Sequence, residues 1–246
     1  MTSESTDLGQ AASVIEQWRD LVTGATCVLF DFDGPICGLF AGHRAHDIAD
    51  RMIGWLGERG HEVRLTGRER DDPQAVLRAV AVAHPEQLIV RDLEQSLTEA
   101  ELTAVPTAAP TPHADALIRE WAVRGVPLAI ATNNSSRAAS RYLARRGLSD
   151  CFARHVYGRT ENLDHLKPHP YSLVRALAAL QADPAKSLMI GDTPTDLQAA
   201  RTAGVPFLGY GRDPARIARL RTAGAEAVVA SMEDVLRLLT EDGAQA

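Results

Sequence analysis

The chain has 246 residues, of which 45% are apolar and 24% are charged, and its formal net charge is -6 at pH 7. This length fits one large domain or a core with a small second domain, and the apolar content argues against wholesale disorder. The acidic balance argues against nucleic-acid binding through a basic surface.

The cysteine content and the N-terminus indicate a compartment. The three cysteines are widely spaced and form neither a disulfide framework nor a CxxC metal site, so we expect a reducing, cytoplasmic location. The N-terminal ten residues have neither the basic nor the apolar region of a signal peptide. No apolar run is long enough to span a bilayer, so we expect no membrane partner.

The first ordered elements are predicted to be a helix and a buried strand. Residues 11–22 have apolar side chains at helical spacing, after ten polar residues that we expect to be frayed. Residues 27–30, CVLF, form a short apolar run typical of a strand buried on both faces. Asp31 and Asp33 follow at once, so this strand ends in two carboxylates.

The next part of the chain is predicted to be all-helical. Helical patterns occupy residues 43–60, 73–84 and 91–102, with no convincing strand between them. Residues 104–112, AVPTAAPTP, have the composition of a stiff linker. We therefore expect a core made of residues 1–37 and 113–246, interrupted by a helical subdomain at 38–112.

Strands and helices alternate in the second half of the chain. Short apolar runs predict strands at 127–132, 187–192, 205–210 and 225–230, and helical patterns occupy 135–147, 171–181, 195–204 and 231–241. Residues 209–214, GYGRDP, are predicted to be a loop. This alternation predicts the α/β class, with a Rossmann-like core and a mostly parallel sheet.

Polar residues collect at the predicted carboxyl ends of the strands, where open parallel sheets bind ligands. This set consists of Asp31, Asp33, Thr132, Asn133, Asp192 and the nearby Asp196, and Lys167 lies in a turn before a helix. Several carboxylates around one point suit a hard divalent cation, most plausibly Mg²⁺. A lysine and a hydroxyl suit phosphoryl oxygens, and a carboxylate nucleophile can divide phosphate-ester hydrolysis into two displacements.

The same residues resemble the motifs of the haloacid dehalogenase superfamily, in its phosphatase branch. DFDG at 31–34 matches the first motif, DxDG, and Thr132 in ATNNS matches the second. Lys167 in KPHP matches the third, and GDTPTD at 191–196 matches the fourth. The four occur in order over nearly the whole chain, and the helical insert resembles the family's helical cap, as in phosphoglycolate phosphatases and β-phosphoglucomutases.

This resemblance implies a role for each matching residue. Asp31 is expected to be the nucleophile that becomes an aspartyl phosphate, and Asp33 the general acid and then the general base. Thr132 and Lys167 are expected to hold the phosphoryl oxygens, with Asn133 also binding substrate. The implied reaction is hydrolysis of a small phosphorylated metabolite.

The resemblance also implies a metal site and a specificity site. Asp31, the backbone carbonyl of Asp33 and Asp192 are expected to bind Mg²⁺, with Asp196 supporting them. In capped enzymes of this kind a cap loop reaches the core site. We therefore expect the arginines of that loop to meet a second anionic group of the substrate; they are Arg68 and Arg70.

Two alternatives use the same residues. A phosphoryl transferase of the β-phosphoglucomutase type would return the phosphoryl group to a sugar, and a regulatory module would bind phosphate without turnover. The chain departs from the family at Pro35, where Thr is common, and this change could alter rate or substrate choice. The sequence predicts no particular oligomeric state.

Overall fold

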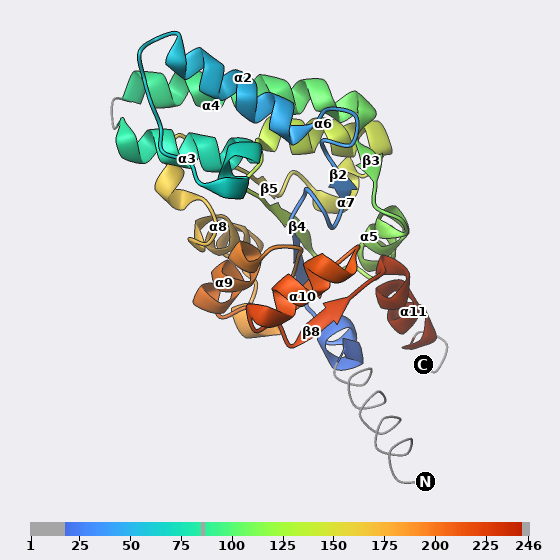
Figure 1. Cartoon of the computed structure of the whole chain (residues 1–246). Helices are drawn as coiled ribbons and strands as arrows, with labels where there is room; N and C mark the ends of the chain where they lie inside the picture. The colour runs from blue at the N-terminus through green and yellow to red at the C-terminus, as the bar shows by residue number, and fades with distance from the viewer. Residues whose placement is uncertain (1–17, 85–86, 243–246) are drawn as a thin grey trace.

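The computed structural model describes residues 18–84 and 87–242 (Figure 1). Its centre is a six-stranded sheet in the order β5-β4-β1-β6-β7-β8, in which every neighbouring pair is parallel. The strands are β1 (Cys27–Phe30), β4 (Leu128–Ala131), β5 (Val156–Tyr157), β6 (Ser187–Gly191), β7 (Phe207–Tyr210) and β8 (Ala227–Val229). The α/β class and the parallel sheet are confirmed.

Strand β1 lies where the strand order reverses, since later strands are added on both of its sides. Phe30, its last residue, is in register with Ile130 of β4 and Ile190 of β6. The residues that follow these three strands therefore emerge side by side. Crevices at such switch points are where open α/β sheets bind ligands.

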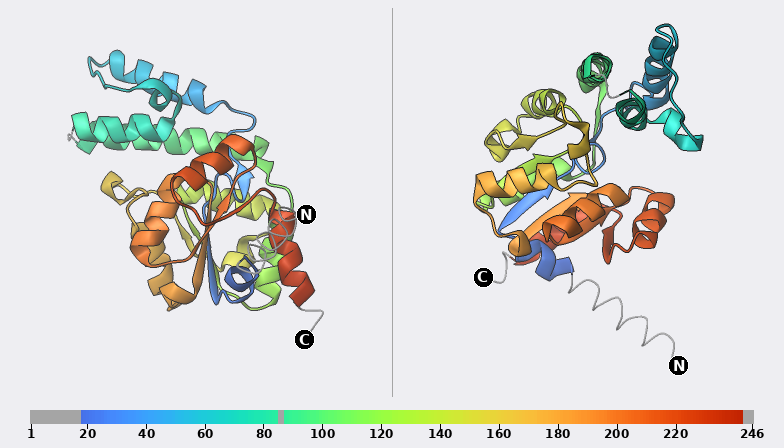
Figure 2. Two further views of the ribbon diagram at one scale, coloured as in Figure 1. Left: turned by 60° about the horizontal axis from the view of Figure 1, so that its bottom comes forward. Right: turned by 90° about the vertical axis from the view of Figure 1, so that its left-hand side faces the viewer.

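Helices cover both faces of the sheet (Figures 1 and 2). One face carries α5 (Ala114–Val123), α6 (Ser136–Arg146), α7 (Ser149–Phe152) and α11 (Met232–Asp242). The other carries α8 (Tyr171–Leu180), α9 (Pro194–Ala203) and α10 (Pro214–Thr222). Short 3-10 turns occur at η3 (Leu163–His165) and η4 (Pro184–Lys186).

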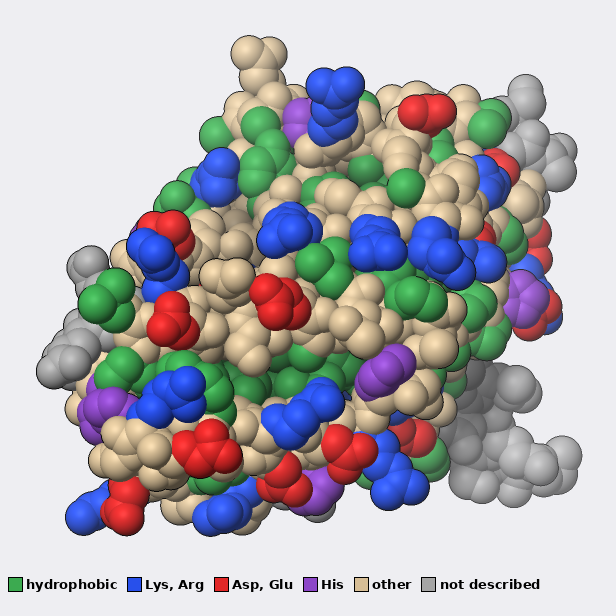
Figure 3. Space-filling view, turned by 90° about the horizontal axis from the view of Figure 1, so that it is seen from above, with side chains coloured by type: hydrophobic (Ala, Val, Ile, Leu, Met, Phe, Trp, Pro, Cys, Tyr) green, Lys and Arg blue, Asp and Glu red, His purple; other side chains and the backbone are tan. Residues whose placement is uncertain are grey.

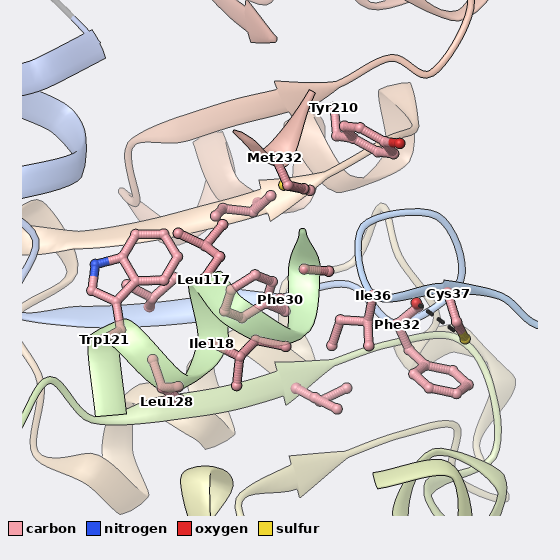
Figure 4. Close-up of a cluster of buried hydrophobic side chains, with 14 of the residues drawn as sticks. Phe30, Phe32, Ile36, Cys37, Leu117, Ile118, Trp121, Leu128, Tyr210 and Met232 are labelled. Carbon is pink, nitrogen blue, oxygen red and sulfur yellow. Dashed lines mark hydrogen bonds between the residues drawn. The ribbon is translucent and has the colours of Figure 1, made fainter. Parts of the chain in front are cut away.

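Aromatic side chains fill the core beneath β1 (Figure 4). Phe30 is fully buried and meets Trp121 of α5 edge-to-face, with ring centroids 5.8 Å apart. Phe32 meets Tyr142 of α6 in the same way, at 5.5 Å. These contacts fix the strand end that carries the two aspartates, because a buried ring cannot shift without opening a cavity.

A helical layer crosses the carboxyl ends of the strands (Figure 2). It consists of α2 (Ala45–Gly57), η1 (Gly67–Asp71), α3 (Pro73–Ala83) and α4 (Gln87–Ala104). The layer has its own apolar cluster, which includes Ile48, Met52, Leu77, Val80 and Leu97. The helices expected in residues 43–102 are therefore present, with ends shifted by a few residues.

The two junctions between this layer and the sheet lie next to each other. Strands β2 (Cys37–Gly38) and β3 (Ala109–Pro110) pair antiparallel, after the 3-10 turn η2 (Val105–Thr107). The expectation of a plain linker without a strand was wrong here, because a two-residue strand depends on its distant partner and leaves no local pattern.

Three other segments differ from the sequence predictions or lie partly outside the structure. The short strand β5 was missed, and the segment GYGRDP, expected to be a loop, ends β7 and begins α10. The helix expected at 11–22 is seen over 18–23, and its earlier part lies outside the described residues.

The outer face of the helical layer carries charges of both signs around a band of apolar side chains (Figure 3). None of the helices in the described ranges has both the length and the apolar character needed to cross a bilayer.

Candidate active site

Three aspartates converge at the switch point. Asp31 follows β1, Asp192 follows β6, and Asp196 lies in the first turn of α9. Each offers a carboxylate oxygen within 4.8 Å of the others, and all three residues are buried. In the part of the chain that the structure describes, no other group of three or more acidic, histidine or cysteine side chains comes this close.

Lys167 lies between two of these carboxylates. Its Nζ is 2.8 Å from Asp31 Oδ1 and 2.5 Å from Asp196 Oδ1, and it donates to the carbonyl of Ala131 at 2.9 Å. Burial lowers the pKa of Lys167, but the charges of Asp196 and Asp31 outweigh burial and raise it above its usual range. The side chain is therefore a buried ammonium aimed at Asp31.

Asn133 holds the backbone of Lys167 at both ends. The backbone N–H of Lys167 donates to Asn133 Oδ1 at 2.7 Å, and Asn133 Nδ2 donates to the carbonyl of Lys167 at 3.2 Å. Its amide is thus used to orient the lysine. It also lines the cavity in front of Asp31, where the sequence placed a substrate-binding residue.

Thr132 is turned toward its own loop. Its hydroxyl donates to Asn134 Oδ1 and accepts from the backbone N–H of Asn134, both at 3.1 Å. The residue is buried and, unlike Asn133 and Asn134, is not among the residues that line the cavity. The structure therefore does not place the Thr132 hydroxyl at the cavity, where the sequence analysis expected it to hold a phosphoryl oxygen.

Asp33 lines the cavity beside Asp31. The backbone N–H of Leu39 donates to its Oδ1 at 2.8 Å. Burial, opposed by this hydrogen bond and assisted by the charge of Asp31, raises the pKa of Asp33 to about 6. The carboxylate of Asp33 does not belong to the acidic group formed by Asp31, Asp192 and Asp196.

The turn after Asp33 packs tightly against the cluster. Gly34 has a positive φ of 124°, and a Cβ there would collide with the carboxylate of Asp192. Its carbonyl accepts a hydrogen bond from the hydroxyl of Thr111 at 2.6 Å. Thr111 directly follows β3, so this bond connects the turn to the junction through which the chain leaves the helical layer. Pro35 is buried within the same turn.

Asp192 is a buried carboxylate that lacks a full set of partners. One oxygen, Oδ2, pairs with Arg216, whereas Oδ1 is buried and has no hydrogen-bond partner among residues 18–84 and 87–242. Burial, followed by the charges of Asp196 and Asp31, raises the pKa of Asp192 well above its usual range. A cation in contact with Oδ1 would relieve this arrangement, and carboxylate oxygens are the ligands that Mg²⁺ prefers.

The cavity in front of Asp31 measures 450 Å³ and has two walls. The helical layer and its approach supply Phe40, Ala41, Ala45, Asp72 and Gln74. The opposite wall carries three arginines that the sequence analysis missed, Arg212, Arg216 and Arg219. We call these three the arginine rim. Arg212 follows β7, and Arg216 and Arg219 lie on α10, the helix that was not predicted.

The two arginines expected at this site are placed elsewhere or are not described. Arg70 lies on η1, is exposed, and is not among the residues that line the cavity. The side chain of Arg68 lies outside the described part of the structure.

A buried ion pair behind the site was also missed. Arg159 donates to both carboxylate oxygens of Glu101, at 3.0 and 3.2 Å, and to the carbonyl of Asn133 at 3.0 Å. Glu101 in turn accepts from Asn134 Nδ2 at 3.0 Å and from the backbone of Ser135 at 2.8 Å. Helix α4 is therefore joined to the loop that orients Lys167.

Comparisons with known proteins agree with this geometry. A sequence model of haloacid dehalogenase-like hydrolases matches residues 25–204. Phosphoglycolate phosphatase from Rhodospirillum rubrum is 38% identical over 107 residues, which are 42% of this chain and 44% of the relative. Pyrophosphatase PpaX from Anoxybacillus flavithermus is 31% identical over 142 residues, 52% of this chain and 63% of the relative. The matched region thus spans less than two thirds of either relative.

A solved structure extends the similarity over most of the chain. A HAD family hydrolase from Deinococcus radiodurans R1, with bound phosphate and sodium, superposes with a TM-score of 0.58 at 26% sequence identity. The match covers 89% of this chain and 96% of that chain.

Proposed function

Because the chain belongs to the haloacid dehalogenase-like hydrolase family, we propose that it is a phosphatase that releases inorganic phosphate from a small phosphorylated metabolite. The observation that carries this proposal is the position of Asp31, a carboxylate at the switch point that is paired with the buried ammonium of Lys167. A carboxylate so placed can attack phosphorus, while the ammonium neutralises charge on the phosphoryl oxygens.

The reaction proceeds in two displacements. The Asp31 carboxylate attacks phosphorus, the bond to the leaving oxygen breaks, and Asp33 donates a proton to that oxygen. Water then attacks phosphorus and gives a proton to Asp33, the bond between phosphorus and the Asp31 oxygen breaks, and inorganic phosphate leaves, which restores the resting state. The raised pKa of Asp33 supports the acid role, since a general acid must hold its proton near the working pH.

The acidic cluster fits a resident Mg²⁺. Asp31, Asp192 and Asp196 are the residues that would hold it, and the unpartnered Oδ1 of Asp192 is the observation that supports the fit. When bound, the ion supplies positive charge to the transferring phosphoryl group. Lys167 keeps Asp31 oriented. The helical subdomain at residues 38–112 acts as a cap that excludes water from the site.

The names of the relatives favour hydrolysis over phosphoryl transfer to a sugar. The names of the two curated relatives, a phosphoglycolate phosphatase and a pyrophosphatase, both describe enzymes that hydrolyse phosphate compounds. A binding module without turnover has no use for a general acid at Asp33.

The test is the accumulation of free phosphate from an aryl phosphate with Mg²⁺ present. We expect steady release by the wild-type protein and almost complete loss in Asp31→Asn, because an amide is a poor nucleophile. Asp234→Asn, an acidic-to-amide change on the distant helix α11, is the matched control and should keep full activity. Turnover by Asp31→Asn at the wild-type rate would disprove the assignment.

A further inference from the structure

The arginine rim is fixed by the start of helix α10. Asp213 caps this helix, since its Oδ1 accepts from the backbone N–H of Arg216 at 2.9 Å, and Pro214 occupies the first turn. Arg216 and Arg219 are three residues apart and therefore share one face of the helix. Arg212 immediately precedes the cap, and all three line the cavity.

The neighbouring face of α10 is anchored in the core. Leu220 is fully buried in the apolar cluster between α9 and β8, with Ile217 packed against that cluster. Gly211 lets the helix approach, because a Cβ there would collide with Ile217. The helix cannot roll without exposing these side chains, so its arginine face stays toward the cavity.

The three arginines differ in how far neighbouring carboxylates neutralise their charges. Arg216 pairs with Asp192 and lies 3.4 Å from Asp213. Arg212 has Asp213 only at 4.0 Å, with more than half of its side chain exposed. Among the residues described, no carboxylate forms an ion pair with Arg219. Two guanidinium groups at the rim are thus available to an anion.

Positive charge is divided between the floor and the rim of the cavity. On the floor, the charge of Lys167 is taken up by Asp31 and Asp196. Arg212 extends toward the first junction, since a Cβ built on Gly38 would lie 3.8 Å from its Nη1. Asp31 and the arginine rim line the same cavity, so a molecule with its phosphoryl group at Asp31 shares that cavity with the arginines.

We propose that the arginine rim is a subsite for a second anionic group of the substrate. The substrate is then a small metabolite with a phosphate at one end and a carboxylate or second phosphate at the other, because guanidinium groups bind both with paired hydrogen bonds. The inference rests on the proposed phosphatase function. It places recognition on the core helix α10, whereas the sequence analysis placed it on Arg68 and Arg70.

Three non-hydrolysable probes test the subsite by calorimetry with excess Mg²⁺. Phosphonoacetate carries a carboxylate, methylenebisphosphonate carries a second phosphonate, and ethylphosphonate carries no second anion. We expect the wild-type protein to bind at least one of the first two more tightly than ethylphosphonate. Arg212→Gln and Arg219→Gln should each weaken that binding by about 10- to 100-fold, the usual worth of a charged hydrogen bond, and leave ethylphosphonate unchanged.

Arg221→Gln is the matched control, because Arg221 lies on the same helix but does not line the cavity. It should bind all three probes as the wild-type protein does. Equal affinity of the wild type for all three probes would overturn the subsite, as would rim variants that lose all three equally. Phosphate release is measured in parallel: selective binding without turnover would reject only the phosphatase function, and turnover without selectivity would reject only the subsite.

Discussion

Asp196 uses its two carboxylate oxygens for different purposes. Oδ2 accepts three hydrogen bonds, from the backbone of Asp192 at 3.2 Å and from the backbone and hydroxyl of Thr193 at 3.0 and 2.7 Å. Oδ1 pairs with Lys167. The residue therefore shapes the loop after β6 as well as contributing charge, whereas one oxygen of Asp192 has no partner in the described part of the chain.

This difference predicts opposite behaviour of two amide variants. Asp196→Asn should lower the free energy of unfolding without metal by about 1–3 kcal/mol, because the amide replaces one acceptor oxygen with an NH₂ donor that must face either Lys167 or the buried donors of the loop. Asp192→Asn should leave that free energy unchanged or raise it, since burial and neighbouring carboxylates disfavour its charge. Urea denaturation with and without Mg²⁺ measures both effects.

Metal binding provides the second readout for the same pair. A bound ion stabilises the folded state by RT ln(1 + [L]/Kd), so Mg²⁺ should raise the wild-type unfolding midpoint and raise that of Asp192→Asn much less. If Mg²⁺ raises the unfolding midpoint of Asp192→Asn as much as that of the wild-type protein, Asp192 does not bind the metal.

Asp33 offers a test that depends on the leaving group. Asp33→Asn should slow release of an alkyl alcohol by about 10²- to 10⁴-fold, the usual worth of a general acid, with little change in KM. Release of nitrophenolate, which needs no proton, should slow much less. Comparing kcat/KM for the two substrates, which reports the first displacement alone, separates the acid role of Asp33 from its base role in the second, and equal losses on both would contradict the acid role.

At the scale of elements, α4 and the loop after β4 are joined by Arg159 and Glu101, whose side chains have no exposed surface. Arg159→Met should destabilise the protein by about 3–5 kcal/mol, because it leaves a buried carboxylate unpaired. The double variant Arg159→Met/Glu101→Gln should be less destabilised than the single one, since the unpaired charge is gone. Unfolding midpoints in urea provide the comparison.

An exposed ion pair serves as the control for this network. Arg237→Met breaks the solvent-exposed pair with Glu233 and should leave the midpoint unchanged, because such pairs contribute little. A double variant less stable than Arg159→Met would show that the pair does not act through buried charge.

Elements with strong local patterns were predictable from the sequence, and those that depend on distant partners were not. The run CVLF and the carboxylates after it fixed the position of Asp31, and parallel register then brought Asp192 beside it. Helix α10 was missed because it buries only a short apolar stripe around Leu220, and its arginines were missed with it. The partners of Glu101 could not be found, since a helical glutamate is usually exposed.

At the scale of the whole molecule, the cavity lies between the helical layer and the sheet edge, and its 450 Å³ limits what can reach Asp31. Sites of this volume accommodate small molecules. We expect release of phosphate from small phosphorylated metabolites and no measurable release from a phosphoserine peptide. Comparable kcat/KM values for both classes, measured by phosphate release, would mean that the helical layer opens fully during turnover.

The pairing of β2 with β3 has a consequence for how this architecture can vary. Because Cys37 is opposite Pro110 in one antiparallel ladder, the segment between them starts and ends at nearly the same point. Closing such a loop costs little more when it lengthens, since each doubling adds only about 0.6 kcal/mol. We expect that the helical layer between Gly38 and Ala109 can be replaced by a segment of different length. The reactive groups at the ends of the strands would keep their positions.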